Sequence, residues 1–431
     1  MRVPRPTTVH GLLGVWIGLQ MRAAGPRLRG GAAVLVALSA LGLARARAGR
    51  ARPAVADATR AAFQRPPTGQ DTSLDPAVVA TPAGWVVAWT RWPSGTTAPG
   101  ILVRTLRADG APADAPRRLS VEGTSARFAT FARCGGRLGV AWASSEDDAR
   151  WPVFPWFAVI DDAARDVVRP RRVGDEESRQ PSLACDGDGW VLGSGVFGSP
   201  YRVTRFGADG ASRGPAVTLP ALGDAFGPSA LTSLGDLWVV GESRHDRPRA
   251  RSAVTLRWVD RDGRVLARHD TAWVDGHTGP LAWSARGATA WATFGADMGF
   301  ELRHAPWGMR VEGRTVAVPA RPMAPRRTAD VPTLSCDGAS CVAAWSEAAG
   351  GEPARLRVQA LGADGAPRGP ARVVGPAARL QPWGRVALAR SLDERALLAV
   401  WVVDDAAGPA LLAVPLTPEG APAGPLRRVD R

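Results

Sequence analysis

Four cysteines are the residues whose chemistry is easiest to anticipate: Cys134, Cys185, Cys336 and Cys341. Cys336 and Cys341 flank the turn-forming segment Asp-Gly-Ala-Ser at 337–340, so a hairpin places them opposite each other. An oxidising compartment would join them in a disulfide, whose short loop limits its entropic gain to about 2 kcal/mol. Zinc is the alternative, but neither a second close cysteine pair nor a nearby histidine completes such a site.

Cys134 and Cys185 precede glycine-bearing turns in two other segments that resemble the one around Cys336. The places opposite them in those hairpins hold Leu138 and Trp190. Two outcomes remain open: a disulfide between neighbouring units, or two buried thiols. We expect buried thiols.

Tyr201, the single tyrosine, opens an apolar segment with Arg202 and Arg205 close by. A sialidase-like enzyme would need such a tyrosine as its nucleophile, beside a glutamate and an arginine cluster that binds a carboxylate. The alternative, which we favour, is an aromatic residue half-buried in a strand. Tyr201 is kept as a candidate ligand-binding residue.

Tryptophan is abundant, with 17 residues, and carbohydrate binding on aromatic platforms is one interpretation. Most of them recur at a fixed position of the repeat described below, which is typical of core packing. Trp151 and Trp156 do not, and they lie in an insertion at 143–157 that would overhang one face. They are the other two candidate ligand-binding residues.

Other catalytic chemistry finds little support. The chain has no lysine, which excludes a Walker loop and a Schiff base, and no His-Glu-x-x-His motif. Its histidines are not at metal-ligand spacing. The acid pairs at 161–162 and at 186 and 188 offer oxygen ligands for calcium, but acids at turns commonly accept backbone hydrogen bonds. We predict no metal, no cofactor and no catalytic residue.

These residues sit in a repeat of roughly fifty residues. Each unit opens with a proline, or with Phe128 in the second unit, before a short apolar segment. A five-residue run rich in valine, alanine and tryptophan follows, as at 85–89 and 341–345, and predicts a strand buried on both faces. The opening prolines are Pro76, Pro181, Pro228, Pro280, Pro332 and Pro382.

A turn closes each unit, usually Asp-Gly, whose glycine supplies the positive φ of a tight hairpin between a third and a fourth strand. Four strands per unit without helical periodicity predict an all-β fold, a β-propeller of seven four-stranded blades. An array of β-sandwiches, six or eight blades, and the mode of ring closure are left open. The blades are expected at 76–122, 125–174, 179–221, 225–274, 278–320, 329–375 and 380–430.

The segments Ala-Cys-Asp-Gly-Asp-Gly-Trp-Val-Leu at 184–192 and Arg-Ala-Asp-Gly-Ala-Pro at 107–112 resemble uncharacterised propeller repeats of secreted proteins from high-GC bacteria. The resemblance covers almost all of 76–430. It implies the fold and export, but no activity.

The net charge of +14 is concentrated near the N-terminus, where residues 1–66 hold eleven arginines and one acidic residue, Asp57. The remainder is close to neutral, so we expect no nucleic-acid partner. Arginines, an apolar run at 30–43 and small residues after it predict a signal peptide at 1–48, with Met21 as a plausible true start and 1–20 as a mis-called segment. Residues 49–75 are expected to be a linker or an N-terminal strand. The apolar run is too short for a stable membrane anchor.

These observations predict a secreted or periplasmic, non-catalytic binding scaffold for a protein or glycan. A glycoside hydrolase or lyase with acids at the channel mouth is the alternative, and a structural spacer is a third hypothesis.

Overall fold

Valine, alanine, leucine and tryptophan are frequent in the second strands of the repeat units. In β2 (Gly84–Trp92), for example, the first seven residues are all buried, although their side chains point alternately to opposite faces. A strand can bury both faces only between two other sheets. Each unit therefore needs a neighbour on either side, and a ring provides one for all of them.

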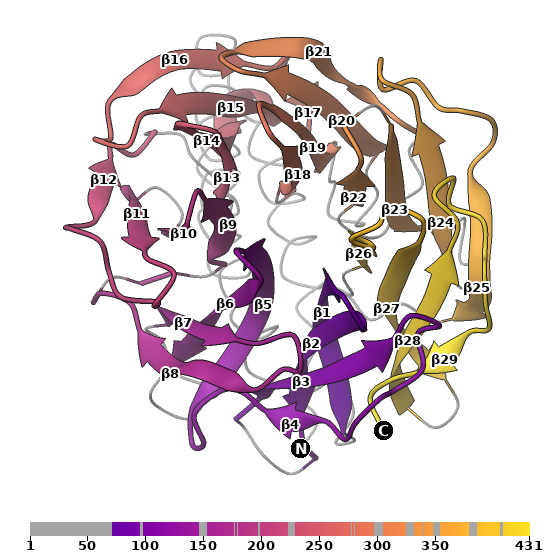
Figure 1. The fold of residues 1–431 in the computed structure, drawn as a ribbon. Helices are drawn as coiled ribbons and strands as arrows, with labels where there is room; N and C mark the ends of the chain where they lie inside the picture. The colour runs from indigo at the N-terminus through magenta and orange to yellow at the C-terminus, as the bar shows by residue number, and fades with distance from the viewer. Residues whose placement is uncertain are drawn as a thin grey trace, which may run out of the picture. The chain divides into compact units, whose positions relative to one another are not determined.

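A computed structural model shows this ring directly as a seven-bladed β-propeller (Figure 1). The first strand of each blade lies at the centre and the fourth at the periphery. The described residues are 71–94, 98–145, 153–175, 177–178, 180–196, 199–222, 229–276, 278–279, 281–296, 305–324, 332–338, 340–347, 354–378, 386–405 and 408–431. The predicted signal peptide lies outside them.

Strand bounds follow the predicted units closely. Blade 1 contains β1 (Thr72–Thr81), β2 (Gly84–Trp92), β3 (Gly100–Arg107) and β4 (Arg117–Arg118). Blade 2 contains β5 (Ser125–Cys134), β6 (Arg137–Ser145), β7 (Phe154–Ile160) and β8 (Asp166–Arg172). Blade 3 contains β9 (Ser182–Asp186), β10 (Gly189–Ser194), β11 (Tyr201–Phe206) and β12 (Val217–Leu219).

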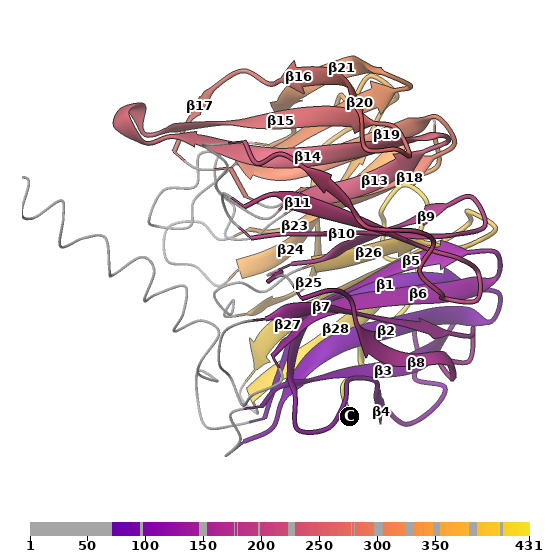
Figure 2. The same cartoon turned by 90° about the vertical axis from the view of Figure 1, so that its left-hand side faces the viewer.

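Blade 4 has a fifth strand and a long β14–β15 hairpin that projects beyond its neighbours (Figure 2). It contains β13 (Ala230–Leu234), β14 (Leu237–Asp246), the 3₁₀ helix η1 (Arg247–Arg249), β15 (Arg251–Val259), β16 (Val265–Asp270) and β17 (Val274–Asp275). Blade 5 contains β18 (Ala282–Arg286), β19 (Thr289–Ala296), β20 (Ala305–Glu312) and β21 (Thr315–Pro322).

Blade 6 contains β22 (Thr333–Cys336), β23 (Cys341–Glu347), β24 (Ala354–Leu361) and β25 (Arg372–Ala378). Blade 7 contains β26 (Val386–Arg390), β27 (Leu397–Asp405), β28 (Gly408–Leu416) and β29 (Arg427–Arg428). The first strand begins at Thr72, so 72–75 belong to blade 1 rather than to a linker. Within the described part of the chain, no helix has the length and apolarity of a membrane span.

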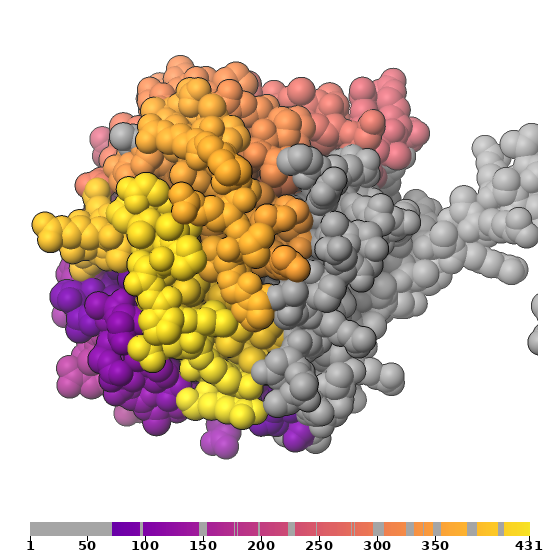
Figure 3. All heavy atoms as spheres, turned by 90° about the vertical axis from the view of Figure 1, so that its right-hand side faces the viewer, coloured from indigo at the N-terminus to yellow at the C-terminus, as the bar shows by residue number. Residues whose placement is uncertain are grey.

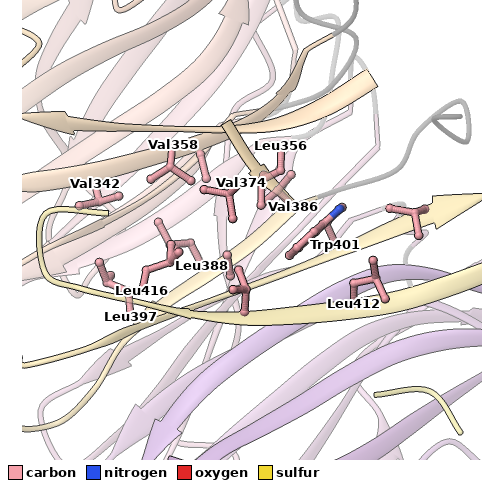
Figure 4. Packing of buried hydrophobic residues seen from close by; sticks show 14 of the residues in the cluster. Val342, Leu356, Val358, Val374, Val386, Leu388, Leu397, Trp401, Leu412 and Leu416 are labelled. Atoms are coloured by element: carbon pink, nitrogen blue, oxygen red, sulfur yellow. The ribbon is translucent and has the colours of Figure 1, made fainter. Parts of the chain in front are cut away.

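Apolar side chains between facing blades form the core. Between blades 6 and 7, Val342, Leu356 and Val358 face Leu397 and Trp401 across the interface (Figure 4). The recurring tryptophans pack in this way, as predicted. The second-strand residues Trp89, Trp142, Trp345 and Trp401 are all buried.

The Asp-Gly turn of blade 3 and the Glu-Gly turn of blade 7 contact the preceding blade. Gly210 and Gly420 have φ of 74° and 79°, the conformation that the sequence pattern predicts. A Cβ on Gly210 would lie 2.9 Å from Val168 Cγ2 of blade 2, and one on Gly420 would lie 2.6 Å from Val358 Cγ1 of blade 6. Glycine therefore serves both the turn and the close approach between blades.

Arginines of the outer strands reinforce these turn contacts, and we call this arrangement the arginine clasp. In each case a fourth-strand arginine donates to the turn between the third and fourth strands of the next blade. The clasps run from Arg117 to the Ala164 carbonyl, from Arg171 to that of Gly210, from Arg321 to that of Asp364, and from Arg427 to Asp109 Oδ2 at 2.8 Å.

Blade 7 closes the ring on blade 1 without exchanging a strand, because each sheet is built from consecutive strands. Ser73 Oγ donates to Asp430 Oδ2 at 3.0 Å, and Arg104 Nη1 donates to the Val429 carbonyl at 2.9 Å. Blade 7 lies directly against blade 1 on the outer surface (Figure 3). Closure therefore depends on side chains and chain ends.

Both pairs of cysteines form disulfides. Cys336 and Cys341 face each other across the β22–β23 hairpin, as predicted. Cys134 and Cys185 also pair, between blades 2 and 3, with their Cα atoms 5.2 Å apart. The expectation of buried thiols was wrong.

The reason is strand register. Cys134 is the last residue of its strand and pairs with Arg137, whereas Cys185 lies one residue before the end of β9 and pairs with Trp190. Side chains of successive strand residues point to opposite faces. The one-residue offset therefore turns Cys134 towards blade 3 and Cys185 towards blade 2. Two disulfides indicate an oxidising environment, extracellular or periplasmic.

Candidate functional site

The central channel contains a cavity of about 260 Å³ to which the first strands of all seven blades contribute. These strands are inner edge strands, so each is paired on one side only. Backbone N–H and C=O groups on the free edge therefore face the channel. The lining side chains are apolar, aromatic, hydroxyl or amide groups, and include Phe128, Phe131, Trp283, Thr130, Gln180 and Ser229.

Three of the prolines that open the repeat units line this cavity: Pro76, Pro181 and Pro332. The other three lie outside the described residues. Proline has no N–H to donate, which an unpaired inner edge tolerates. The register refines the sequence comparison, because Ala129 rather than Phe128 corresponds to Pro76. In both blades the strand is irregular at that point.

Phe128 has the least favourable backbone of the lining residues. Its φ of 61° is a left-handed conformation that a bulky side chain rarely adopts, at a cost of about 1–3 kcal/mol. The Arg127 guanidinium lies 4.7 Å from its ring centroid and also pairs with the buried Asp75 of blade 1 at 3.0 Å. A strained aromatic residue at the channel thus sits on an ion pair that joins two blades.

Tyr201 does not reach the channel. It is 2% exposed, and its hydroxyl shares a hydrogen bond with Ser182 Oγ at 2.7 Å. Ser182 lines the cavity and also accepts a hydrogen bond from the Leu231 N–H at 2.9 Å. Burial raises the pKa of the Tyr201 hydroxyl well above its usual value, so the phenolate that a nucleophile requires is strongly disfavoured.

A glutamate and an arginine lie near Tyr201, a grouping that the sequence did not predict. Glu242 of β14 forms an ion pair with Arg257 of β15, and both side chains are almost fully buried. Burial raises the pKa of Glu242, opposed by Arg257 and by a hydrogen bond from Ser229. Arg257 Nη1 also donates to the Pro220 carbonyl at 2.7 Å. The group is enclosed behind the serines of the channel wall.

Of the two candidate tryptophans, Trp151 lies outside the described residues. Trp156 lies in β7 rather than in an overhanging loop, and its ring stacks on that of Trp142 with centroids 6.4 Å apart. It is half-buried against the core between blades 1 and 2. The structure therefore does not bring Trp156 and Tyr201 together in one pocket.

The acids considered as calcium ligands are engaged by arginines. Asp186 pairs with Arg205 and Arg261, each at 3.3 Å, and Asp162 pairs with Arg133. No group of three His, Cys, Asp or Glu side chains within the described ranges is arranged to hold a metal ion.

Comparisons with known proteins assign the chain to no family. No protein-family model matches the chain, and no curated protein matches it. Similar solved structures include a prolyl endopeptidase, with 15% identity and a TM-score of 0.47 over 86% of this chain and 51% of that one. The β-propeller domain of the Trilobed protease from Pyrococcus furiosus has 11% sequence identity and a TM-score of 0.45, over 83% of this chain and 95% of that one.

Trypanosoma rangeli sialidase gives 11% identity and a TM-score of 0.43 over 79% of this chain and 54% of that one. The chain thus spans about half the length of the prolyl endopeptidase and of the sialidase. These similarities concern the fold alone and assign neither substrate nor reaction.

Proposed function

We propose that the chain is an exported, non-catalytic binding scaffold that takes a protein or glycan ligand in its central channel. The observation that carries the proposal is the composition of the cavity wall. Among the described lining residues, apolar and aromatic side chains alternate with a few hydroxyl and amide groups, and none carries a charge. Such a wall is typical of a binding pocket. Export is supported by the two disulfides.

The same wall favours a protein side chain over a sugar. A hexose would bring several hydroxyl groups that need partners, and beside the backbone groups of the free strand edges the wall offers them few hydroxyl and amide side chains. The Ser182 hydroxyl is already bonded to Tyr201 and Leu231, and that of Ser229 to Glu242. Phe128 and Trp283 instead offer aromatic surface to an apolar group.

A propeller glycoside hydrolase or lyase is less well supported. Glycosidases commonly use two carboxyl groups about 5–10 Å apart that flank the bond to be cleaved. No carboxyl group belongs to the described cavity lining. Glu242, with its raised pKa, lies behind Ser229 in an ion pair with Arg257, where a substrate does not meet it.

Two variants test the channel as the binding site. Ala77→Glu adds a carboxylate to the cavity wall, whereas Ala83→Glu makes the same change at an exposed position of the adjacent β1–β2 turn. Purified wild-type chain is applied to a peptide array and to a glycan array. We expect binding on one of them, at least ten-fold weaker in Ala77→Glu and unchanged in Ala83→Glu. No wild-type binding on either array, or equal binding by Ala77→Glu, would contradict the proposal.

A further inference from the structure

Ser182 is a residue of the channel wall whose hydroxyl has hydrogen-bond partners on two blades. It lies in β9 and is half-buried at the cavity. Ala184, two residues further along the strand, packs with blade 4, so Ser182 is on the face turned towards that blade. From there its hydroxyl reaches Tyr201 of its own blade and the backbone of Leu231 in blade 4.

A glycine at position 193 allows Tyr201 to reach this serine. Gly193 lies between the two strands that carry them, because it pairs with Ser182 of β9 and with Val203 of β11. A Cβ on Gly193 would collide with the Tyr201 hydroxyl. The contact between the two hydroxyl groups is therefore built into the sheet rather than into a loop.

This group holds more hydrogens than it can accept. The Leu231 N–H donates to Ser182 Oγ at 2.9 Å, and the oxygens of the two hydroxyl groups are 2.7 Å apart. One hydroxyl donates to the other, which leaves one hydroxyl proton without an acceptor. Within the described part of the chain, neither hydroxyl has a further hydrogen-bond partner.

Burial determines which proton is left over. Tyr201 is 2% exposed, and a buried donor without an acceptor is costly, so its hydroxyl donates to Ser182. The serine oxygen then accepts from Tyr201 and from Leu231 with its two lone pairs, and its own proton remains to be donated into the cavity. An ordinary serine hydroxyl can both donate and accept. Ser182 offers the channel a donor alone.

We propose that Ser182 selects a channel ligand that presents a carbonyl oxygen to it. The inference rests on the function proposed above and specifies its ligand: an uncharged peptide segment, whose C=O accepts from Ser182 while its apolar part packs in the cavity. A carbonyl oxygen accepts without bringing a proton of its own. A sugar hydroxyl or an indole N–H brings a proton that this serine cannot accept.

Two probes of the same shape test the donor in ligand-observed NMR titrations. Acetophenone carries a carbonyl, and α-methylstyrene has a methylene group in place of the oxygen. We expect the wild type to bind acetophenone about five-fold more tightly, the effect of one neutral hydrogen bond. Ser182→Ala should abolish this preference. Ala77→Glu, which adds a charge to the same wall, should weaken the binding of both probes.

Ser120→Ala is the matched control for effects on folding. Ser120 Oγ also accepts from a strand N–H, that of Ile101 at 3.0 Å, but Ser120 does not belong to the described cavity lining. Both serine variants should lower the melting temperature, and only Ser182→Ala should lose the preference for acetophenone.

Tyr201→Phe tests the orientation of the serine proton. The substitution releases one lone pair of Ser182, which can then accept from the N–H of indole, a probe that only donates. Indole should therefore bind about five-fold more tightly to Tyr201→Phe than to the wild type. An unchanged affinity for indole would overturn the proposal.

The proposal is also overturned if the wild type binds acetophenone no more tightly than α-methylstyrene, or if Ser182→Ala keeps the preference. N-acetylphenylalanine amide and N-acetylglucosamine compare a peptide carbonyl with a sugar-borne one, and tighter binding of the sugar would overturn the assignment to a peptide. The array experiment remains a separate test. Array binding that Ala77→Glu weakens, without a preference for the carbonyl probe, would overturn this inference and leave the proposed function standing.

Discussion

Tyr201 illustrates how a residue that invites a catalytic interpretation can serve packing. Its hydroxyl reaches only Ser182, and Ser182 in turn holds the Leu231 N–H of the next blade. The single tyrosine thus belongs to a hydrogen-bonded link between blades 3 and 4.

Replacing Tyr201 by phenylalanine should therefore lower the free energy of unfolding by about 1 kcal/mol, the usual net worth of one buried hydrogen bond. Urea denaturation measures the change. In a Ser182→Ala background the same substitution should lower the free energy of unfolding clearly less, because the hydroxyl that Tyr201 bonds to is already absent. Equal costs in both backgrounds would refute the link.

Glu242 predicts a pH dependence of stability. Burial raises the pKa of its carboxyl in the folded state above the ordinary 4.5. The folded protein then holds this proton more tightly than the unfolded chain does. The resulting stabilisation is complete below the ordinary pKa and is lost as pH rises through the folded value.

Glu242→Gln removes this titration. Between about pH 4.5 and 7, the free energy of unfolding of the variant should therefore fall less, or rise more, with pH than that of the wild type. Urea denaturation at several pH values gives both curves. Parallel curves would show that the carboxyl titrates alike in the folded and unfolded states.

Sequence reasoning found the residues that repeat and missed those that do not. The opening prolines and the second-strand tryptophans were predicted because they recur in the blades. Asp75 and Arg127 were missed because their contact spans 52 residues and is unique to one interface. Glu242 left one signal, a charged residue directly after the apolar run at 237–241, within a strand buried on both faces, where it requires an opposite charge.

At the scale of the strands, one residue of register determines how the cysteines pair. The sequence places both Cys134 and Cys185 beside glycine-bearing turns, and this likeness obscured their offset. Only the hydrogen-bonded pairs of each hairpin show that the two side chains face each other. Hairpin geometry sufficed for Cys336 and Cys341, which are local partners.

The two disulfides should differ in what they contribute. Cys134–Cys185 spans 51 residues and Cys336–Cys341 spans 5. Loop-closure entropy gives about 4 kcal/mol for the first and about 2 kcal/mol for the second. A Cys134→Ser, Cys185→Ser double variant should thus lose about 2 kcal/mol more than a Cys336→Ser, Cys341→Ser double variant. Guanidinium denaturation under non-reducing conditions compares them, and equal losses would contradict the entropic argument.

At the scale of the whole molecule, the ring depends on the seam between blades 7 and 1. The repeat predicted seven blades but left closure open, because closing contacts such as Ser73 with Asp430 occur once and join opposite ends of the chain. The candidate site could not be predicted from the sequence for a similar reason. The cavity wall is assembled from seven separate strands, one from each blade.

Asp430→Ala should destabilise the seam by about 3 kcal/mol. The buried carboxylate accepts from Ser73 Oγ and from Arg428 Nε at 2.8 Å, and its loss leaves these donors without their partner. Asp175→Ala, which removes a fully exposed partner of Arg172, is the control and should change stability by less than about 0.5 kcal/mol. Equal losses of stability in thermal denaturation would show that the Asp430 contacts contribute no more to stability than an exposed ion pair does.

Closure without strand exchange also determines the order in which the chain can assemble. Every sheet is complete within roughly fifty consecutive residues, and such local contacts form fast. The strands of each blade can therefore pair as soon as their own segment emerges from the ribosome, and the blade is stabilised when it docks on the blade before it. Blade 1 must wait longest for its second neighbour, with one apolar face uncovered until the last residues arrive. That interval is when the growing ring is most exposed to aggregation.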